Sequence, residues 1–418
     1  MASRLRVAIL LVLALATQAP ASSAAKQAHP SASASAGAVL LAGGALRDDN
    51  HALWLALYQH VRATSGKEHP RIAVFGSARP SLAKAREAFE KDTPQGLSYG
   101  SLFRRYGFDP VFVPVAIDTY RTAASDVRNV ALVDTADAVW FGGGNQDFHA
   151  RSLLGDDGSD SPVMAAVRRV HARGGLVGGT SAGAAVMDEF TYGEGTSAQY
   201  LAQNALAIKP ILEIPATASV NRALAGSYTR GFGFVTPLDA AVDTHTDARG
   251  RYGRLLVAMR VLDYQHGVAV AEDTALLIQG RRGTVHGTGR VLIADARKAA
   301  YPPGGAFQVT GLRLSSLAAS DAYDFETGTV TSTKPRLASP VLPAATPSVD
   351  LLTRDRLLDA MEGLAASPQT HLVSTLTLPQ SRLQLRLEKT PATRAYRDPV
   401  TGRFSVQGLE ASVSERRP

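Results

Sequence analysis

The sequence predicts an α/β fold, a three-layer α/β/α sandwich whose central sheet is mostly parallel. Three observations predict it. From residue 37 onward, apolar runs of strand length alternate with stretches of helical spacing. The strand-like runs are apolar along their whole length, as strands buried on both faces are. Two of them end in glycine-rich turns, at 142–144 and 178–183, and sites in such folds lie beyond the carboxyl ends of the strands.

Each element is expected from its own residue pattern. The β-rich apolar runs that should form strands are GAVLLAGGAL, RIAVFGSA, FDPVFVPV, ADAVWFGGGNQ and LVGGTSAG. Apolar residues recur at helical spacing in HALWLALYQHVRAT, LAKAREAFEK and SPVMAAVRRVHARGG. Further along, VAVAEDTALLIQG and GTVHGTGRVLIADA are expected to be strands joined by hairpin turns, and SDAYDFETGTV closes this part of the chain.

We expect five segments along the chain. Residues 1–25 combine two arginines, an apolar run and small residues, which is the pattern of a secretory signal peptide. Residues 26–36 are expected to be a flexible leader, and residues 37–335 a catalytic domain. Prolines interrupt residues 336–349, which we interpret as a linker. Residues 350–418 contain an amphipathic helix and the alternating run SRLQLRLE, and are expected to form a small α+β appendage.

Composition narrows the class of protein. The signal-peptide pattern predicts a secreted or periplasmic protein. No later stretch reaches the ~18 apolar residues of a membrane span, so the mature chain is expected to have no such span. The chain has no cysteine, which excludes disulfides, thiolate metal ligands and cysteine nucleophiles. Its formal net charge of +7 is spread without a basic block, which argues against a nucleic-acid partner. No metal-ligand spacing is apparent, and we expect neither metal nor cofactor.

The strongest functional signal is Gly179-Thr180-Ser181-Ala182-Gly183. It fits G-x-S-x-G between a predicted strand and a predicted helix, the context of a nucleophile elbow. Small neighbours leave a strained serine accessible, and the N–H groups of the following helix can stabilise an oxyanion. We therefore interpret Ser181 as a nucleophile rather than as part of a plain tight turn.

A serine nucleophile needs a base, and His245 is the best candidate. It follows an apolar strand in VDTHTDARGRYGRLL, where Arg249, Arg251 and Arg254 precede a helix. The alternative interpretation of these arginines is ordinary surface pairing, as between Asp247 and Arg251.

The base needs an orienting acid, and several carboxylates lie between Ser181 and His245. These are Asp188, Glu189, Glu194, Glu213, Asp239 and Asp243. Glu194 stands in a glycine-framed loop, TYGEGTS, that can return to the site. Asp188 and Glu189 are expected to be solvated on the helix after the elbow. We therefore expect Glu194 to complete the triad.

Taken together, FGGGNQ, GGTSAGAAVM, VDTHTDARGRYGRLL and EDTALLI resemble the cyanophycinase branch of the peptidase E-like serine peptidases. The resemblance covers residues 37–335. It implies a fold like that of class I glutamine amidotransferases, no cofactor and, by analogy with related enzymes, a homodimer. It also implies hydrolysis of cyanophycin, a polyaspartate whose side chains carry arginine in amide linkage, to β-Asp-Arg dipeptides.

The resemblance assigns roles to individual residues. Ser181 matches the nucleophile and His245 the base, while Gly143 and Gly144 correspond to the oxyanion loop, together with the Ala182 N–H. The residues at substrate-pocket positions are Gln146, Asp243, Thr244, Arg249, Arg251 and Arg254.

Charge suits this substrate, because arginines can pair with its carboxylates and Asp243 can receive its guanidinium. The chain departs from intracellular members at Asn145, where they commonly have Asp, and at Thr244, where they have Gln.

Three other functions stay open on sequence alone. An α/β-hydrolase-type esterase shares the elbow and the Ser-acid-His order, but it normally places its histidine late in the chain. An Asp-specific dipeptidase would act on Asp-containing peptides. A non-catalytic exported binding module would keep the fold without turnover, and the presence of both Ser181 and His245 argues against it.

Overall fold

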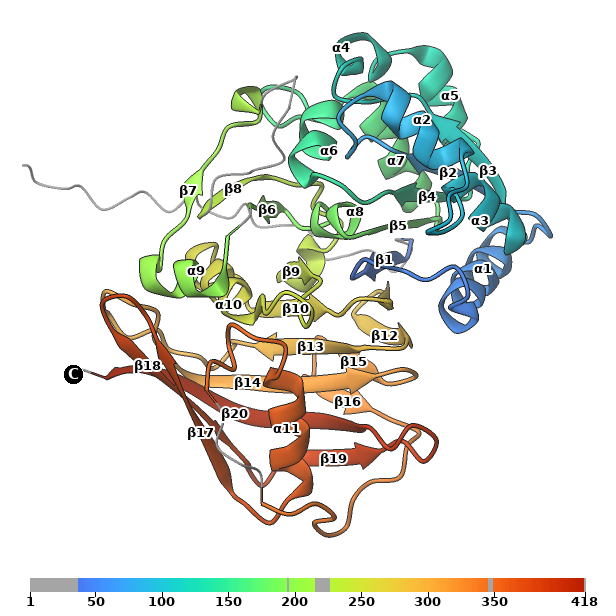
Figure 1. Ribbon diagram of the computed structural model, residues 1–418. Coiled ribbons are helices and arrows are strands. Elements are labelled where there is room, and N and C mark those ends of the chain that lie inside the picture. The colour runs from blue at the N-terminus through green and yellow to red at the C-terminus, as the bar shows by residue number, and fades with distance from the viewer. Residues whose placement is uncertain (1–36, 194, 215–225, 345–348, 417–418) are drawn as a thin grey trace, which may run out of the picture. The chain divides into compact units, whose positions relative to one another are not determined.

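The structure, a computed structural model, describes residues 37–193, 195–214, 226–344 and 349–416 (Figure 1). The expected signal peptide and leader lie outside these residues, as does Glu194. The described residues fall into a single structural unit. Within them, no helix combines the length and apolar character that crossing a membrane requires.

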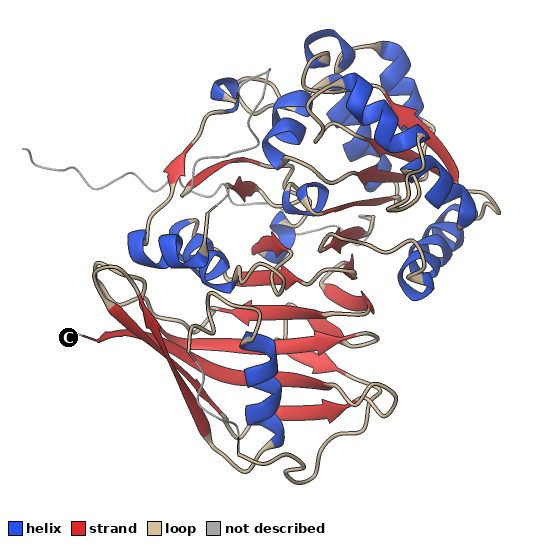
Figure 2. Cartoon of the chain, viewed as in Figure 1, coloured by secondary structure: helices blue, strands red, loops and turns tan. Residues whose placement is uncertain are grey.

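The first sheet is parallel among its N-terminal strands, and Figure 2 shows helices around it. Its strands, counted over the described residues, lie in the order β16-β15-β12-β11-β1-β5-β4-β2-β3. Strands β1, β5, β4, β2 and β3 run parallel, and β11, β12, β15 and β16 are added antiparallel. The bounds are β1 (Val39–Ala42), β2 (Arg71–Phe75), β3 (Asp109–Val113), β4 (Ala138–Phe141), β5 (Leu176–Thr180), β11 (Thr274–Gln279), β12 (Arg282–Gly287), β15 (Ala322–Asp324) and β16 (Thr329–Thr331).

Helices begin and end where the sequence supplies caps. Asn50 accepts a hydrogen bond from the third residue of α1, and Gly66 ends that helix in the left-handed conformation. Ser161 caps α7, whose first residue is Pro162. The helices are α1 (His51–Ser65), α2 (Leu82–Glu90), α3 (Tyr99–Arg105), α4 (Tyr120–Ala123), α5 (Val127–Asp134), α6 (Gln146–Leu153), α7 (Pro162–Ala172), α8 (Ala182–Ala185), α9 (Ser197–Gln203), α10 (Tyr252–Val261) and α11 (Leu357–Ala366), with 3-10 turns at Ile211–Glu213 and Thr236–Leu238.

Helices cover both faces of the parallel strands. Val39 and Leu41 of β1 pack into one apolar core together with side chains of α5 and α7. Leu40 and Ala42 point the other way, into a core that contains side chains of α1 and α3. This alternation explains why the strands are apolar along their whole length. The predicted mostly parallel sheet is therefore confirmed.

A second, largely antiparallel sheet was not predicted. Over the described residues its order is β17-β18-β20-β14-β13-β10-β9, with β19 paired to β20. Only β9 and β10 run parallel within it. The bounds are β9 (Ala240–Thr244), β10 (His266–Val270), β13 (Arg290–Asp295), β14 (Val309–Ala318), β17 (His371–Thr377), β18 (Arg382–Glu388), β19 (Arg394–Arg397) and β20 (Phe404–Arg416).

The C-terminal segment is part of this second sheet, which corrects the expectation of a separate appendage at 350–418. Strand β20 lies between β14 and β18 and is hydrogen-bonded to both. Side chains of α10, α11, β13 and β18 share one apolar core. The alternating run of β18 was predicted correctly. The side chains that bury its apolar face come from segments both before and after the expected linker at 336–349.

The strands of a small third sheet follow both glycine-rich turns in the sequence and precede β9, the first strand of the second sheet. Its order is β6-β8-β7, with bounds β6 (Phe190–Tyr192), β7 (Ala207–Ile208) and β8 (Ser227–Arg230). The carbonyl of Tyr192, at the end of β6, accepts a hydrogen bond from the side chain of Gln146 at 3.0 Å. This sheet therefore contributes directly to the surroundings of Ser181.

Candidate active site

Ser181 stands on the sharp turn between β5 and α8, as the sequence predicts. Its backbone has φ 55° and ψ −115°, a conformation that non-glycine residues rarely adopt. A Cβ atom at Gly183 would lie 2.0 Å from the Phe141 carbonyl oxygen. One at Gly179 would lie 2.6 Å from the backbone of Gly183. Glycine is required on both sides because the turn packs directly against β4.

His245 follows β9, at the edge of the second sheet, and its Nε2 lies 2.8 Å from Ser181 Oγ. Its backbone φ is 53°, and its N–H donates to the Gly43 carbonyl at 2.9 Å. A Cβ at Gly44 would lie 2.2 Å from the imidazole ring, so only glycine leaves room for it. The serine and histidine therefore come from two different sheets, joined by the loop after β1.

The carboxylate that contacts His245 is Glu272, whose Oε1 lies 2.6 Å from Nδ1. Glu272 follows β10, which pairs in parallel with β9, so the two strands end side by side. The carboxylates predicted for this role, Glu194 among them, lie between the serine and the histidine, whereas Glu272 lies beyond that interval. Glu194 itself lies outside the described residues.

The Glu272 carboxylate fixes the protonation of the imidazole. A carboxylate only accepts hydrogen bonds, so Nδ1 carries the proton and Nε2 accepts from the Ser181 hydroxyl. Burial lowers the pKa of His245 below its ordinary 6.5, and the hydrogen bond to Glu272 partly opposes this. The imidazole is therefore neutral, and able to act as a base, at neutral pH.

This direction of shift predicts the pH dependence of activity. Since neutral His245 is the active form, kcat/KM should rise with pH through a pKa below 6.5 and should be flat at neutral pH. A profile of kcat/KM between pH 4 and 8 measures this. Without the Glu272 hydrogen bond, which raises the pKa, the acid limb should move to lower pH. An inflection above 6.5 would contradict the assignment of His245 as the base.

Two residues that line the pocket with Ser181 have unengaged backbone N–H groups in the described part of the chain. Within the described residues, the N–H groups of Gly144 and Ala182 have no hydrogen-bond partner, and both residues line the pocket that contains Ser181. The third expected oxyanion donor, the Gly143 N–H, is already engaged, because it donates to Tyr99 Oη at 3.1 Å. Gly144 has φ 150° and a Cβ there would lie 2.4 Å from the Ala78 carbonyl oxygen. Gly144 and Ala182 are therefore the better oxyanion donors.

A buried histidine supports this glycine loop. His149 Nε2 lies 2.8 Å from the Gly142 carbonyl oxygen, and its Nδ1 lies 2.8 Å from Ser77 Oγ. Burial lowers the pKa of His149 to about 4, so the ring is neutral. Because the carbonyl only accepts, Nε2 carries the proton and Nδ1 accepts from the serine hydroxyl. Neither residue belongs to a motif that is recognisable in the sequence.

The pocket beside Ser181 is small, about 50 Å³, and most of its lining is polar or charged. It contains each of the expected substrate-binding residues. The lining comprises Gly144, Gln146, Ser181, Ala182, Ala185, Thr191, Tyr192, Val242, Asp243, Thr244, Arg249, Arg251 and Arg254. Its size suits the end of one substrate side chain rather than a whole dipeptide.

Asp243 and Arg254 are already paired with each other. Arg254 Nε and Nη2 each lie 2.6 Å from an oxygen of Asp243, and both side chains are almost completely buried. Burial would lower the pKa of Arg254, but the Asp243 carboxylate beside it raises the pKa above its ordinary value. Asp243 also accepts the Thr244 N–H at 2.7 Å. The expected role of Asp243 as receptor of a substrate guanidinium does not agree with this pairing.

Arg249 and Arg251 remain available to a substrate. Arg251 donates to the Thr244 carbonyl at 3.0 Å, and its side chain is 16% exposed. Burial lowers the pKa of Arg251 to about 10, and the charge of Arg254 adds to this effect. Arg249 is exposed at the mouth of the pocket. Both arginines line the pocket, which favours a substrate-binding role over the alternative of ordinary surface pairing.

Asp188 is buried, not solvated as predicted, and Glu189 is buried too. Asp188 Oδ1 lies 2.5 Å from Tyr264 Oη, and Oδ2 accepts the Val242 N–H at 3.1 Å. Burial raises the pKa of Asp188 to about 7. The side chain connects the segment after α8 to β9, and so links the serine turn to the strand that precedes His245.

Asp188→Asn should change how stability depends on pH. The folded pKa is about 7 and the ordinary value 3.8, so the native state holds an extra proton between these values. The stability contribution of Asp188 is therefore full below pH 3.8 and lost as pH rises through 7. Asparagine mimics the protonated acid, so the difference in unfolding free energy between variant and wild type should shift in favour of the variant from pH 4 to 8. Urea unfolding across that range measures it, and a constant difference would contradict the assignment.

A serine on a strand–helix turn, bonded to a histidine that contacts a carboxylate, is the arrangement of a serine hydrolase. Comparison with known proteins agrees with this class of protein, because the chain is a distant homologue of cyanophycinases. It is 28% identical over 312 residues to the cyanophycinases of Trichormus variabilis and of a Nostoc species, covering 72% of this chain and 90% of each relative. It is also 28% identical over 260 residues to that of Geminocystis herdmanii, covering 60% of this chain and 85% of the relative. This homology indicates a peptidase-type hydrolase.

No protein-family model matches the chain. Solved structures that align with it include a peptidase from an acI-B1 Actinobacterium, with 17% identity and a TM-score of 0.45, covering 69% of this chain and 97% of that one. A putative peptidase E protein from Listeria monocytogenes aligns with 11% identity and a TM-score of 0.37, covering 61% of this chain and 100% of that one.

Proposed function

We propose that the chain is an exported serine peptidase that hydrolyses the polyaspartate backbone of cyanophycin to β-Asp-Arg dipeptides through an acyl-enzyme. The observation that carries the proposal is the hydrogen-bonded series Ser181–His245–Glu272, with contacts of 2.8 and 2.6 Å. Distant homology to cyanophycinases supports the choice of substrate. Export is proposed from the signal-peptide pattern of residues 1–25.

The reaction is acyl transfer. His245 Nε2 takes the hydroxyl proton of Ser181 as the oxygen attacks a backbone carbonyl of the substrate, and Glu272 stabilises the imidazolium that forms. The N–H groups of Gly144 and Ala182 hold the oxyanion. The imidazolium then gives its proton to the leaving amine, and water activated by His245 releases the acyl group from the serine.

Substrate carboxylates are held by Arg249 and Arg251, because Arg251 reaches Asp243 only at 3.8 Å, whereas Arg254 forms both short contacts with that carboxylate. Guanidinium groups form paired hydrogen bonds with carboxylates, which fixes orientation as well as charge. The buried Asp243–Arg254 pair lines the same pocket, and Arg254 donates to both oxygens of the carboxylate.

Arg251→Ala should weaken substrate use more than it weakens the fold. We expect kcat/KM for cyanophycin to fall about 10²-fold, since a charge-assisted contact is lost from a partly buried position. The control is Arg254→Ala, which leaves Asp243 buried without its partner and should lower the melting temperature markedly. Equal kcat/KM for Arg251→Ala and wild type would contradict the role of Arg251.

The deciding experiment compares three substrates. Purified protein should clear cyanophycin granules and release β-Asp-Arg, while a simple ester and an Asp-X dipeptide are turned over slowly or not at all. Preference for the dipeptide would favour an Asp-specific dipeptidase, and preference for the ester an esterase. If the wild type is not labelled by a fluorophosphonate probe, the chain is a binding module rather than an enzyme.

A further inference from the structure

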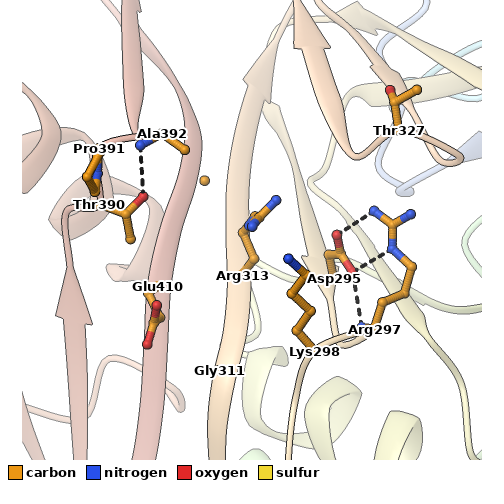
Figure 3. A pocket seen from close by; sticks show the side chains of 11 residues that line it. Asp295, Arg297, Lys298, Gly311, Arg313, Thr327, Thr390, Pro391, Ala392 and Glu410 are labelled. Atoms are coloured by element: carbon orange, nitrogen blue, oxygen red, sulfur yellow. Dashed lines mark hydrogen bonds and ion pairs between the residues drawn. The ribbon is translucent and has the colours of Figure 1, made fainter.

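A second polar pocket, of about 670 Å³, opens on the C-terminal sheet (Figure 3). Its volume is in the range of pockets that take small molecules. Strands β13, β14 and β20 and the turn Thr390–Ala392 before β19 surround it. The charged residues that line it are Asp295, Arg297, Lys298, Arg313 and Glu410.

Three of these residues form one row across the sheet. Arg313 of β14 is directly opposite Asp295 of β13 on one side and Glu410 of β20 on the other. Residues opposite each other in neighbouring strands point to the same face of the sheet. Arg313 therefore stands between two carboxylates on the face that opens into the pocket.

Of these two carboxylates, Asp295 alone has an ion-pair partner among the described residues. Arg297 Nε and Nη2 lie 2.9 and 2.7 Å from the two oxygens of Asp295, and the Arg297 N–H donates to the same carboxylate at 3.1 Å. In the described part of the chain, Lys298, Arg313 and Glu410 have no ion pair and no side-chain hydrogen bond. Figure 3 shows Arg313 and Lys298 between the Asp295–Arg297 pair and the Thr390–Ala392 turn.

The pocket therefore offers two unpaired cations and one unpaired carboxylate. Lys298 and Arg313 suit carboxylates of a ligand, and a guanidinium fork on Arg313 favours paired contacts. Glu410 suits a cationic group. The chemistry matches a ligand that carries both signs of charge and has room for about a dipeptide, rather than a simple anion.

This pocket is distinct from the one beside Ser181. Asp295 is opposite His266, at the start of β10, whereas Glu272 follows the end of that strand. Five residues of strand separate the two ends, roughly 13 Å along its length. The two linings have no residue in common.

We propose that this second pocket binds peptide segments that carry both carboxylate and guanidinium groups, with carboxylates at Lys298 and Arg313 and the guanidinium at Glu410. The inference rests on the proposed function, because each unit of cyanophycin presents both groups. A second point of attachment raises the local concentration of polymer at the triad without any new contact there.

The test uses the full-length Ser181→Ala protein, so that bound polymer is not cut. Co-sedimentation with cyanophycin granules gives an apparent Kd, and Lys298→Ala/Arg313→Gln should raise it about tenfold. The charge-preserving Lys298→Arg/Arg313→Lys should bind more tightly than Lys298→Ala/Arg313→Gln. Lys91→Ala, which removes an exposed lysine elsewhere, should bind as the parent does. An unchanged Kd for Lys298→Ala/Arg313→Gln would overturn the proposal.

Two further measurements keep the result clear. Glu410→Gln changes no cation and should independently raise the apparent Kd. Binding equal to the parent would contradict the role of Glu410, whether or not the double variant folds. In the Ser181-containing protein, Lys298→Ala/Arg313→Gln should keep wild-type kcat/KM on a short soluble substrate. If the wild type fails to hydrolyse cyanophycin while these variants still lose binding, the proposed function falls and the pocket stands.

Discussion

Replacing Ser181 with alanine should reduce kcat for cyanophycin hydrolysis by about 10⁶-fold, because the attacking oxygen is removed. The hydroxyl contributes one hydrogen bond to His245 and little packing, since the turn is formed by backbone and by Gly179 and Gly183. The melting temperature should therefore stay close to that of the wild type. Release of β-Asp-Arg from granules measures the loss, and fluorophosphonate labelling should disappear with it.

Two results would contradict this prediction. Residual turnover of a tenth or more of wild type, about one decade, would show that another group attacks the carbonyl. Labelling that persists in the Ser181→Ala protein would show that the probe reacts elsewhere. The Ser77→Ala variant is a useful comparison, because that hydroxyl also contacts a histidine ring but is fully buried. It should keep the labelling that Ser181→Ala loses.

Replacing Glu272 with glutamine should reduce kcat by about 10³-fold or somewhat more. A neutral amide cannot stabilise the imidazolium, and its N–H₂ group can donate to Nδ1 and so favour the wrong tautomer. The loss is expected at the lower end of the range for triad acids because the Glu272 side chain is 34% exposed and water can partly replace it. Steady-state kcat on cyanophycin measures it.

The matched control is Glu194→Gln, the same chemical change in the carboxylate that sequence analysis favoured. It should leave kcat close to the wild-type value. If Glu194→Gln is the inactive variant and Glu272→Gln retains turnover, the assignment of Glu272 is wrong. Glu272→Asp shortens the side chain but keeps the charge, so it should recover part of the activity that Glu272→Gln loses.

The sequence was sufficient for the parts of the site that depend on local pattern. The glycine-flanked turn at Ser181 has a steric cause that operates within a few residues, and the strand before His245 is apolar enough to recognise. Glu272 was missed because its position depends on the parallel pairing of β9 with β10. The signal that could have found it was AEDT, an acidic residue directly after a buried strand.

The pairing of Asp243 with Arg254 was hidden for a related reason. The two residues are eleven positions apart, across a turn and the start of α10, and only the fold places the guanidinium against the carboxylate. Likewise, the alternation in β18 showed a half-buried strand, but nothing local shows that β20 would be its partner. Pairings between distant strands depend on the tertiary structure, so the local residue pattern does not predict them.

The position of β20 determines when this protein can be assembled. Because that strand is inserted between β14 and β18, ribosomal synthesis has to reach Arg416 before the second sheet is complete. Until then the leucine-rich core between β14 and β18 lacks the side chains of Leu409 and Val413, which β20 supplies. Strand order in the sheet therefore departs from strand order in the chain, so this layer closes only when the last strand is available.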